Sequence, residues 1–314
     1  MKVVALAGGV GGAKFVHGLA KLLTPEELSI IVNTGDDFEY LGLSISPDLD
    51  TVCYTLAELA NPKTGWGRVD ESWITFDEIA ALGGPDWFHL GDKDLGTHLL
   101  RTLYLKQGRS LSDITAAFCN RWGVNHPIYP MSDDPVRTII HTNKGEALAF
   151  QEYFVHQACE PAVRSFEFRG VEKAGPNQFA LRAIEGSDIV MIVPSNPWVS
   201  IDPILAVRGY REAIAEKPVL AVSPLIGGMA LKGPAAKMYQ ELGIRPSAAA
   251  VANHYRKLLT GFVFDHQDAH ELEKIQRWRI IALVTDIIMK DNQDRIRLAE
   301  EVIRFAERIL NRSR

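Results

Sequence analysis

Short apolar runs occur at the start of the chain and again in its second half. Val3–Ala7, Ser29–Asn33, Ile189–Val193 and Val219–Val222 are mostly apolar, which predicts strands that are buried on both faces. An amphipathic pattern predicts a helix over Ala13–Leu23, between the first two strands. A strand, a helix and a second strand at this spacing form a right-handed parallel unit. We therefore expect an α/β fold with a Rossmann-like, doubly wound and mainly parallel sheet.

Other stretches of the chain have different periodicities. The spacing of apolar residues predicts helices over Leu95–Lys106 and Leu111–Trp122, and residues 61–90 are interpreted as a helical excursion from the sheet. Polar and apolar residues alternate within Gly145–Gly170, in the segments FQEYFV and VRSFEFRGV, which predicts antiparallel strands. From Glu271 onward the pattern is mostly helical.

The chain shows no repeat, no low-complexity tract and no obvious linker. We therefore expect one composite α/β domain over residues 1–314. Its added helical region is predicted at about 52–125, and a mostly helical C-terminal region is predicted at 271–314.

Composition places the protein among ordinary globular chains. Hydrophobic residues make up 46% of the 314 residues, and the net charge is -5, which disfavours non-specific binding to nucleic acid or to anionic membranes. No apolar run reaches the roughly 18 residues of a membrane span, and the N-terminus has no signal-peptide layout. Cys53, Cys119 and Cys159 form no CxxC pair, which indicates buried thiols in a reducing compartment. We expect a cytoplasmic protein without nucleic-acid or membrane partners.

A glycine-rich loop with a lysine follows the first predicted strand and contains Gly8, Gly9, Gly11, Gly12 and Lys14. Backbone N–H groups at a helix N-terminus bind anions, and glycine lets a phosphate approach closely. A Rossmann fingerprint started at Gly9 would need glycine at position 14, and a Walker A loop would need Ser or Thr after its lysine. The loop is interpreted as a cradle for a nucleotide or diphosphate, with a purely structural tight turn as the alternative.

Polar residues also follow the second predicted strand, in the segment Asn33-Thr34-Gly35-Asp36-Asp37. Adjacent carboxylates after a strand can hold a hydrated divalent cation or a ribose hydroxyl. The alternative is a helix cap or a solvated turn.

Asp48 and Asp50 lie two residues apart, before a predicted helix in TVCYTLAEL. If this segment is extended, both carboxylates face one side and suit a bridging Mg²⁺ ion. If it forms the first turn of the helix, the two acids only complement the helix dipole. We favour the metal site.

The segment LGDKDLGTH places Lys93 between two acids, Asp92 and Asp94, directly after Gly91. Lys93 could meet a phosphate, and either acid a metal or a hydroxyl group. His98 follows Asp94 by four residues, and for this histidine we favour a packing or capping role over catalysis.

Three further loops carry small polar or acidic side chains. They are the proline-bounded Ser132, Asp133 and Asp134; Ser195, Asn196 and Pro197, which suit a base or a ribose; and the phosphate-proximal set Ser223-Pro224, Gly227-Gly228 and Lys232-Gly233-Pro234-Ala235. No Ser-His-Asp triad and no HExxH signature is present in the sequence. Glycine loop, acid pairs and lysine together favour metal-assisted phosphoryl or nucleotidyl transfer from a diphosphate-containing nucleotide.

The motifs GGVGGAK, NTGDD, ISPDLDTVCYTLA, LGDKDLGTHLLRT, YPMSDDPV, PSNP and SPLIGG resemble, in this order, the 2-phospho-L-lactate transferase family of coenzyme F420 biosynthesis. The resemblance runs from residue 1 to about 265. It implies a Rossmann-type fold with an added helical region, a requirement for Mg²⁺ and a homodimer. It also implies transfer of a phosphorylated three-carbon acid from a guanosine diphosphate donor to the terminal ribityl hydroxyl of the deazaflavin Fo, with release of GMP.

The resemblance also implies roles for individual residues. Gly8, Gly9, Gly11, Gly12, Lys14, Asn33 and Thr34 would touch the diphosphate; Asp36, Asp48 and Asp50 would hold Mg²⁺; Thr51, Gly91 and Asp92 would form the Fo pocket; and Ser132, Asp133, Asp134, Ser195, Asn196 and Pro197 would complete the ligand site. The catalytic residues would be Asp48, Asp50 and Lys93, with Asp50 orienting or deprotonating the acceptor hydroxyl. Lys93 stands where many members have arginine, so it keeps the charge without the bidentate geometry.

Two other classes share the glycine loop. UDP-sugar-binding regulatory proteins of the same superfamily typically have GGGTG there, and an NAD-dependent oxidoreductase is disfavoured by Lys14. SPDLDT and GDKDLGTH favour the transferase. No motif indicates whether the three-carbon acid is phospholactate, phosphoenolpyruvate or phosphoglycerate.

Overall fold

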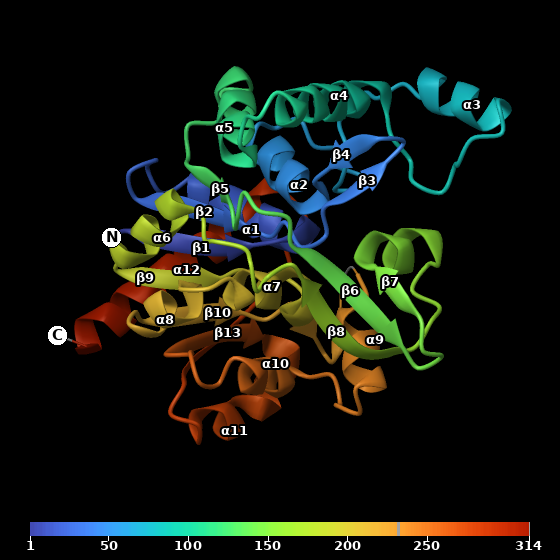
Figure 1. Ribbon diagram of the computed structural model, residues 1–314. Coiled ribbons are helices and arrows are strands. Elements are labelled where there is room, and N and C mark those ends of the chain that lie inside the picture. Colours follow the sequence, from blue (N-terminus) through green and yellow to red (C-terminus); the bar gives the residue numbers. More distant parts are fainter. Residues whose placement is uncertain (231–232, 314) are drawn as a thin grey trace.

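The central element of the computed structural model is a seven-stranded parallel sheet with the order β14-β13-β10-β9-β1-β2-β5 (Figure 1). The structure describes residues 1–230 and 233–313, so Lys232 of the predicted phosphate-proximal loop lies outside the described residues. The strands are β1 (Val3–Ala7), β2 (Leu28–Val32), β5 (Ile128–Pro130), β9 (Ile189–Ile192), β10 (Val219–Val222), β13 (Gly261–Asp265) and β14 (Ile281–Thr285). The parallel α/β fold predicted from the apolar runs is confirmed.

The direction of winding reverses at β1. The chain first adds β2 and β5 on one side of β1, and then adds β9, β10, β13 and β14 on the other side. In such sheets the crevice for a ligand lies beyond the carboxyl ends of the strands at the reversal point. That point lies here between β1 and β9.

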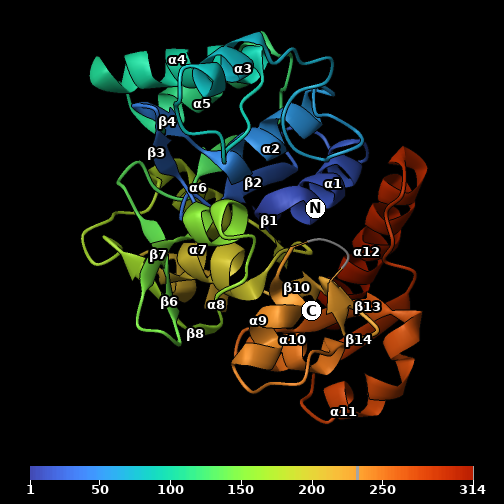
Figure 2. The same ribbon diagram turned by 90° about the vertical axis from the view of Figure 1, so that its right-hand side faces the viewer.

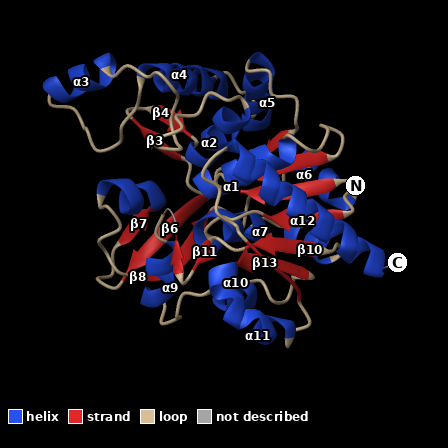
Figure 3. Ribbon diagram, turned by 180° about the vertical axis from the view of Figure 1, so that it is seen from behind, coloured by secondary structure: helices blue, strands red, loops and turns tan. Residues whose placement is uncertain are grey.

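The two faces of the sheet are covered by different helices. Val3, Ala5 and Ala7 of β1 pack in the core formed with α1 (Gly9–Ala20) and α12 (Asn292–Ser313), which cross the face seen in Figure 3. Side chains alternate along a strand, so the other residues of β1 belong to the opposite core. That core includes residues of α6 (Gln178–Glu185), α7 (Asp202–Ala206) and α8 (Tyr210–Ala215).

A helical region extends from the β2–β5 side of the sheet (Figures 1 and 2). It consists of a hairpin, β3 (Phe38–Tyr40) and β4 (Leu43–Ile45), followed by α2 (Pro47–Leu56), α3 (Ile74–Ala81), α4 (Asp92–Lys106) and α5 (Leu111–Arg121). Tyr40, Ile45 and Leu90 form a small core of their own here, and Trp87 and Phe88 pack against it. The added helical region is therefore present, and its union with the sheet into one domain stays a prediction.

A second, antiparallel sheet has the order β7-β6-β8 and is built from β6 (Arg137–Thr142), β7 (Ala147–Ala149) and β8 (Val163–Arg169). The expectation of strands throughout Gly145–Gly170 is wrong at FQEYFV, because Glu152–His156 forms a short π-helix. Phe150 and Tyr153 are both buried, and a separation of three residues brings two side chains to one side of a helix rather than to one face of a strand.

The second half of the chain contains α9 (Ala235–Glu241), α10 (Ala248–His254), α11 (Leu272–Gln276) and α12, and short elements lie at β11 (Leu225–Ile226), β12 (Met229–Ala230), Pro197–Ile201 and His266–Glu271. The region predicted to be mostly helical from Glu271 onward also contains the strand β14. Among the described helices, none combines the length and the apolar character that crossing a lipid bilayer requires.

Candidate active site

A cavity of about 880 Å³ lies over the carboxyl ends of β1 and β9. Much of its lining comes from three parts of the chain. The glycine loop and the loops after β9 and β10 supply Gly8, Gly9, Gly11, Ser195, Asn196 and Ser223; the helical region supplies Asp48, Asp50, Thr51, Tyr54, Trp66, Trp87, Phe88, Asp94 and His98; and the segment after β7 supplies Phe150, Gln151 and Phe154. The cavity therefore has a polar part at the sheet. Its aromatic part is formed by side chains of the helical region and of the segment after β7.

The glycine loop forms the first turn of α1, which begins at Gly9 rather than at the predicted Ala13. The loop is packed so tightly that a Cβ atom on Gly8 would lie 2.5 Å from Asp48 Oδ2, and one on Gly11 would lie 2.7 Å from the carbonyl oxygen of Pro194. Glycine at these positions thus serves close packing against neighbouring loops. The start of α1 still lines the cavity, through Gly8, Gly9, Val10 and Gly11.

Other predicted residues of this loop support it or line the cavity. Ser195 Oγ donates to the carbonyl oxygen of Gly8 (2.7 Å), which ties the loop after β9 to the glycine loop. Asn196 accepts from the N–H of Trp198 (3.1 Å) and also lines the cavity. Lys14 lines the cavity too, and its Nζ donates to the carbonyl oxygen of Met289 (3.1 Å).

Asp36 and Asp48 converge beside the glycine loop and share the amide of Asn33. Asn33 Nδ2 lies 3.2 Å from Asp36 Oδ1 and 2.9 Å from Asp48 Oδ2. Asp48 Oδ1 accepts from the N–H of Gly9 (2.6 Å), and Asp36 Oδ2 accepts from Gln151 Nε2 (3.1 Å). The structure thus brings together the predicted residues of the first two strand ends.

Burial raises the pKa of Asp36 well above its ordinary value, and the charges of Asp48 and Asp37 raise it further. Burial also raises the pKa of Asp48 to about 6. Among the described residues, neither acid forms an ion pair with a basic side chain. Two converging buried carboxylates with amide partners suit a hard divalent cation with oxygen ligands, so the residues present fit Mg²⁺.

The extended conformation that would let Asp48 and Asp50 face one side is wrong. Both acids lie in the first turn of α2, so the helical alternative is correct, and residues two apart on a helix point in nearly opposite directions. Asp50 consequently points away from Asp48 and pairs with Arg101, whose Nη1 donates to Oδ2 (2.9 Å) and whose Nη2 contacts Oδ1.

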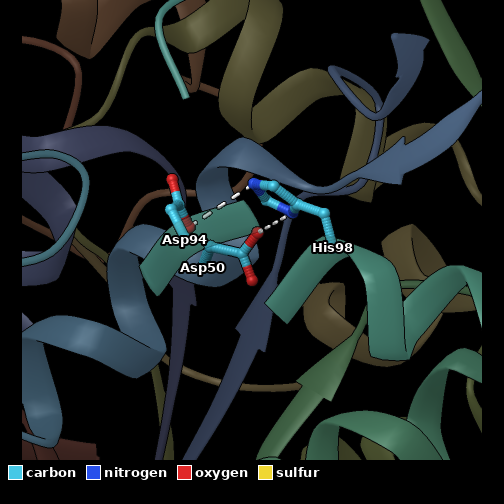
Figure 4. Close-up of side chains that lie close together, drawn as sticks. All are labelled: Asp50, Asp94 and His98. Carbon is cyan, nitrogen blue, oxygen red and sulfur yellow. Dashed lines mark ion pairs between the residues drawn. The ribbon is translucent and has the colours of Figure 1, made fainter. Parts of the chain in front are cut away.

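Asp50, Asp94 and His98 form a second cluster, in which the imidazole lies between the two carboxylates (Figure 4). His98 Nδ1 is 3.7 Å from Asp50 Oδ2, and Nε2 is 3.4 Å from Asp94 Oδ1. Tyr54 donates its hydroxyl to the same Asp94 oxygen (2.7 Å). Burial opposes ionisation of Asp94, but the contacts with His98 and Tyr54 hold its pKa below the ordinary value.

These three residues also offer ligand atoms that lie within 4.8 Å of one another, as a metal site requires. Arg101 already neutralises the Asp50 carboxylate, whereas Asp36 and Asp48 have no such partner among the described residues. Metal ligation by Asp36, Asp48 and Asp50 stays a prediction.

Gly91, Asp92 and Lys93, at the start of α4, lie outside the cavity lining. Asp92 accepts from Ser72 Oγ (2.6 Å) and from two backbone N–H groups, and these hydrogen bonds lower its pKa to about 2. Lys93 Nζ donates to the carbonyl oxygen of Val69 (3.0 Å), and a Cβ atom on Gly91 would collide with Glu71. These contacts connect the start of α4 to the segment before α3. The position of Lys93 therefore gives its predicted catalytic role no support.

Ser132, Asp133 and Asp134 also lie apart from the large cavity. Asp133 and Asp134 line a separate pocket of about 330 Å³. Asp133 accepts from the N–H and the hydroxyl of Ser112 (both 2.7 Å), while Ser132 and Asp134 both bond to Gly175. The three side chains hold neighbouring loops together, and their predicted role in ligand binding has no support from this arrangement.

Thr51 lines the cavity, whereas Gly12, Asn33, Thr34 and Pro197 are not among the residues that line it. Sequence reasoning missed the aromatic end and two buried side chains, Arg101 and Gln151. Arg101 follows His98 by three residues on a predicted helix, so the helical period could have placed both on one side. Gln151 lies far along the chain from Asp36, and no local pattern brings the two together.

Fold and site together define a nucleotide-binding type of α/β protein, with a glycine-rich helix start and buried acids at the winding reversal of a parallel sheet. The chain belongs to the 2-phospho-L-lactate transferase family, because the family model described as 2-phospho-L-lactate transferase CofD matches residues 3–301. This confirms the resemblance seen in the sequence motifs and makes the protein a transferase.

Relatives in this family carry two different names. A phosphoenolpyruvate transferase of Streptomyces griseus is 41% identical over 98% of this chain and 99% of that protein. A 2-phospho-L-lactate transferase of Methanosarcina mazei is 37% identical over 96% of this chain and 99% of that protein. A solved UPF0052 family structure from Bacillus halodurans has a TM-score of 0.65 at 13% identity, covering 96% of this chain and 98% of that one, and it shares the fold.

Proposed function

We propose that this protein transfers a phosphorylated three-carbon acid from a guanosine diphosphate donor to the terminal ribityl hydroxyl of the deazaflavin Fo. GMP leaves, and the product is a precursor of coenzyme F420. The family match over residues 3–301 supports the proposal. The main structural support is that one cavity combines a polar part at the sheet, which suits a nucleotide, with an aromatic part, which suits a planar ring.

The donor end of the cavity is the end at the sheet. Backbone N–H groups at the start of α1 face it and suit the diphosphate oxygens. Ser195, Asn196 and Ser223 follow β9 and β10 there and present small hydrogen-bonding groups to the nucleoside. Asp36 and Asp48 lie beside this position and would hold Mg²⁺, which when bound neutralises charge on the diphosphate.

The acceptor end is aromatic. Trp66, Trp87, Phe88, Phe150 and Phe154 line it, and flat rings of this kind pack favourably against a tricyclic deazaflavin. A ring bound there directs its ribityl chain toward the acids in the middle of the cavity.

Asp50 lines the cavity and is held in place by Arg101. In the proposed reaction the acceptor oxygen attacks the phosphorus in line with the departing GMP, and Asp50 accepts the hydrogen bond of the attacking hydroxyl. Positioning and electrostatic stabilisation supply most of the acceleration in phosphoryl transfer.

Mass spectrometry of the product tests the proposal directly. Fo is incubated with the purified protein, Mg²⁺ and the guanosine diphosphate donor carrying phospholactate, phosphoenolpyruvate or phosphoglycerate in turn. Product from at least one donor is expected, and it identifies the three-carbon acid. Absence of product with all three, together with tight binding of UDP-N-acetylglucosamine in calorimetry, would instead favour a UDP-sugar-binding protein.

The resemblance further predicts a homodimer in the cytoplasm. Light scattering coupled to size-exclusion chromatography measures the oligomeric state, and a mass near twice the 34.8 kDa of the chain is expected.

A further inference from the structure

Arg101 lies directly behind the cavity wall and forms the centre of a buried polar network. Its side chain comes from α4 and is 3% exposed. Arg101 does not itself line the cavity, but Asp50 and His98, which it contacts, both do. Its hydrogen-bond contacts with side chains that line the cavity are therefore with Asp50 and His98.

The guanidinium group makes several contacts at once. Nη1 lies 2.9 Å from Asp50 Oδ2, 3.2 Å from His98 Nδ1 and 3.4 Å from the carbonyl oxygen of Ser44. Nη2 contacts the other oxygen of Asp50. A planar fork that engages both carboxylate oxygens fixes the plane of the carboxylate as well as its position.

The same group also contacts the imidazole ring of His98. Arginine offers only donors, so His98 Nδ1 must accept from Nη1. The proton of the neutral ring is then on Nε2, which faces Asp94 Oδ1 at 3.4 Å. One buried arginine thus sets both the carboxylate plane of Asp50 and the tautomer of His98.

We propose that Arg101 is a positioning residue that holds Asp50 and His98 in the orientation needed to bind the acceptor hydroxyl. This inference rests on the proposed function. The acids of the site then differ in how their charge is balanced. Asp50 is paired with the Arg101 side chain, whereas Asp36 and Asp48 would be neutralised by a bound Mg²⁺ ion.

Steady-state kinetics of Arg101→Lys test the inference, because lysine keeps the charge and loses the bidentate fork. We expect kcat with Fo to fall roughly 100-fold, the size of effect that small misplacement of a reacting group produces. The calorimetric affinity for GDP with Mg²⁺ and the KM for the donor should stay within about twofold, because neither reports on Asp50. Arg109→Lys, at an exposed arginine beyond the same helix, serves as the matched control and should leave all these values unchanged.

A double-mutant cycle shows whether Arg101 acts through Asp50. Asp50→Asn and Arg101→Gln are compared singly and together, and the double variant leaves no buried charge unpaired. If Arg101 acts through Asp50, adding Arg101→Gln to Asp50→Asn lowers kcat by less than about twofold. Comparison of the double variant with Asp50→Asn remains decisive even if Arg101→Gln alone fails to fold.

Two results would overturn the inference: wild-type kcat in folded Arg101→Lys, or independent losses that multiply in the double variant. Failure of the proposed function would look different. In that case the wild-type protein itself forms no product from Fo, whatever residue stands at position 101.

Discussion

The carboxyl group of Asp37 lies in surroundings that oppose its ionisation. Asp37 is buried beside the acids that line the cavity, and its Oδ2 accepts from Ser46 (2.8 Å). Its Oδ1 has no hydrogen-bond partner among the residues that the structure describes. Burial raises its pKa to about 7. The folded state therefore binds more protons than the unfolded state between the ordinary carboxyl pKa of about 4 and pH 7.

This shift predicts how stability varies with pH. The contribution of Asp37 is present at low pH and is lost as the pH rises through about 7, so metal-free protein should melt at a lower temperature at pH 8 than at pH 5. Asp37→Asn should remove part of this difference, as measured by thermal denaturation at both pH values. Asp92→Asn is the control: its acid has a pKa near 2, and the substitution should lower the melting temperature by the same amount at pH 5 and pH 8.

Asp48→Asn tests the proposed metal position. An amide keeps the shape and can still accept from the N–H of Gly9, but it is a weaker ligand for Mg²⁺. We expect the Mg²⁺ concentration for half-maximal activity to rise roughly 10- to 100-fold, as for other changes in the immediate surroundings of a metal. Asp77→Asn, at an exposed acid on α3, should have no effect, and an unchanged Mg²⁺ requirement in Asp48→Asn would argue against this position.

At the scale of elements, the first turn of α1 is defined by its closeness to the loop after β9. Gly11→Ala would place Cβ 2.7 Å from the carbonyl oxygen of Pro194, and that backbone cannot move without displacing the loop. We expect GDP affinity to fall about tenfold or more, because the N–H groups facing the diphosphate shift with the loop.

Gly96→Ala on α4 is the matched substitution, because a Cβ atom at Gly96 meets nothing within 4 Å. Alanine in a helix is better than glycine by roughly 0.5–1 kcal/mol, so this variant should be slightly more stable and bind GDP normally. Calorimetry and thermal denaturation measure both effects. Equal GDP affinity in the Gly11 and Gly96 variants would show that the loop position does not matter for nucleotide binding.

At the scale of the whole molecule, the aromatic end of the cavity forms where the helical region meets the segment after β7. Trp87 of the helical region stacks on His156 of the π-helix after β7, with ring centroids 5.0 Å apart and planes at 19°. Phe150 and Phe154 come from the same segment as His156 and are stacked on each other. The aromatic end of the cavity thus depends on contact between parts of the chain that are about 70 residues apart.

Trp87→Leu should weaken this wall selectively. We expect KM for Fo to rise about tenfold, the size of one lost aromatic stacking contact, while KM for the guanosine diphosphate donor is unchanged. Trp73→Leu, at a tryptophan of the same helical region that does not line the cavity, is the control. A rise in both KM values in Trp87→Leu would place the tryptophan at a shared part of the cavity instead.

The sequence by itself determined the parallel sheet, the glycine loop at its edge and the family, because these depend on local patterns: short apolar runs, glycine spacing and long motifs. It also named Asp36, Asp48, Asp50 and Thr51, which all line the cavity. Only the tertiary structure decided which partners each of these acids contacts. The helical first turn of α2 turns Asp48 toward Asp36 and Asp50 toward Arg101, and side-chain direction depends on backbone conformation.

The tertiary structure also decided which predicted residues stay outside the cavity. Lys93 and Asp133 belong to motifs as suggestive as that of Asp48. Their partners, however, are Val69, in the segment before α3, and Ser112, in the first turn of α5. Hydrogen bonding to a distant segment leaves no periodic signal along the chain. A pattern in sequence therefore indicates which side chains can carry chemistry, whereas long-range packing decides which of them share one site.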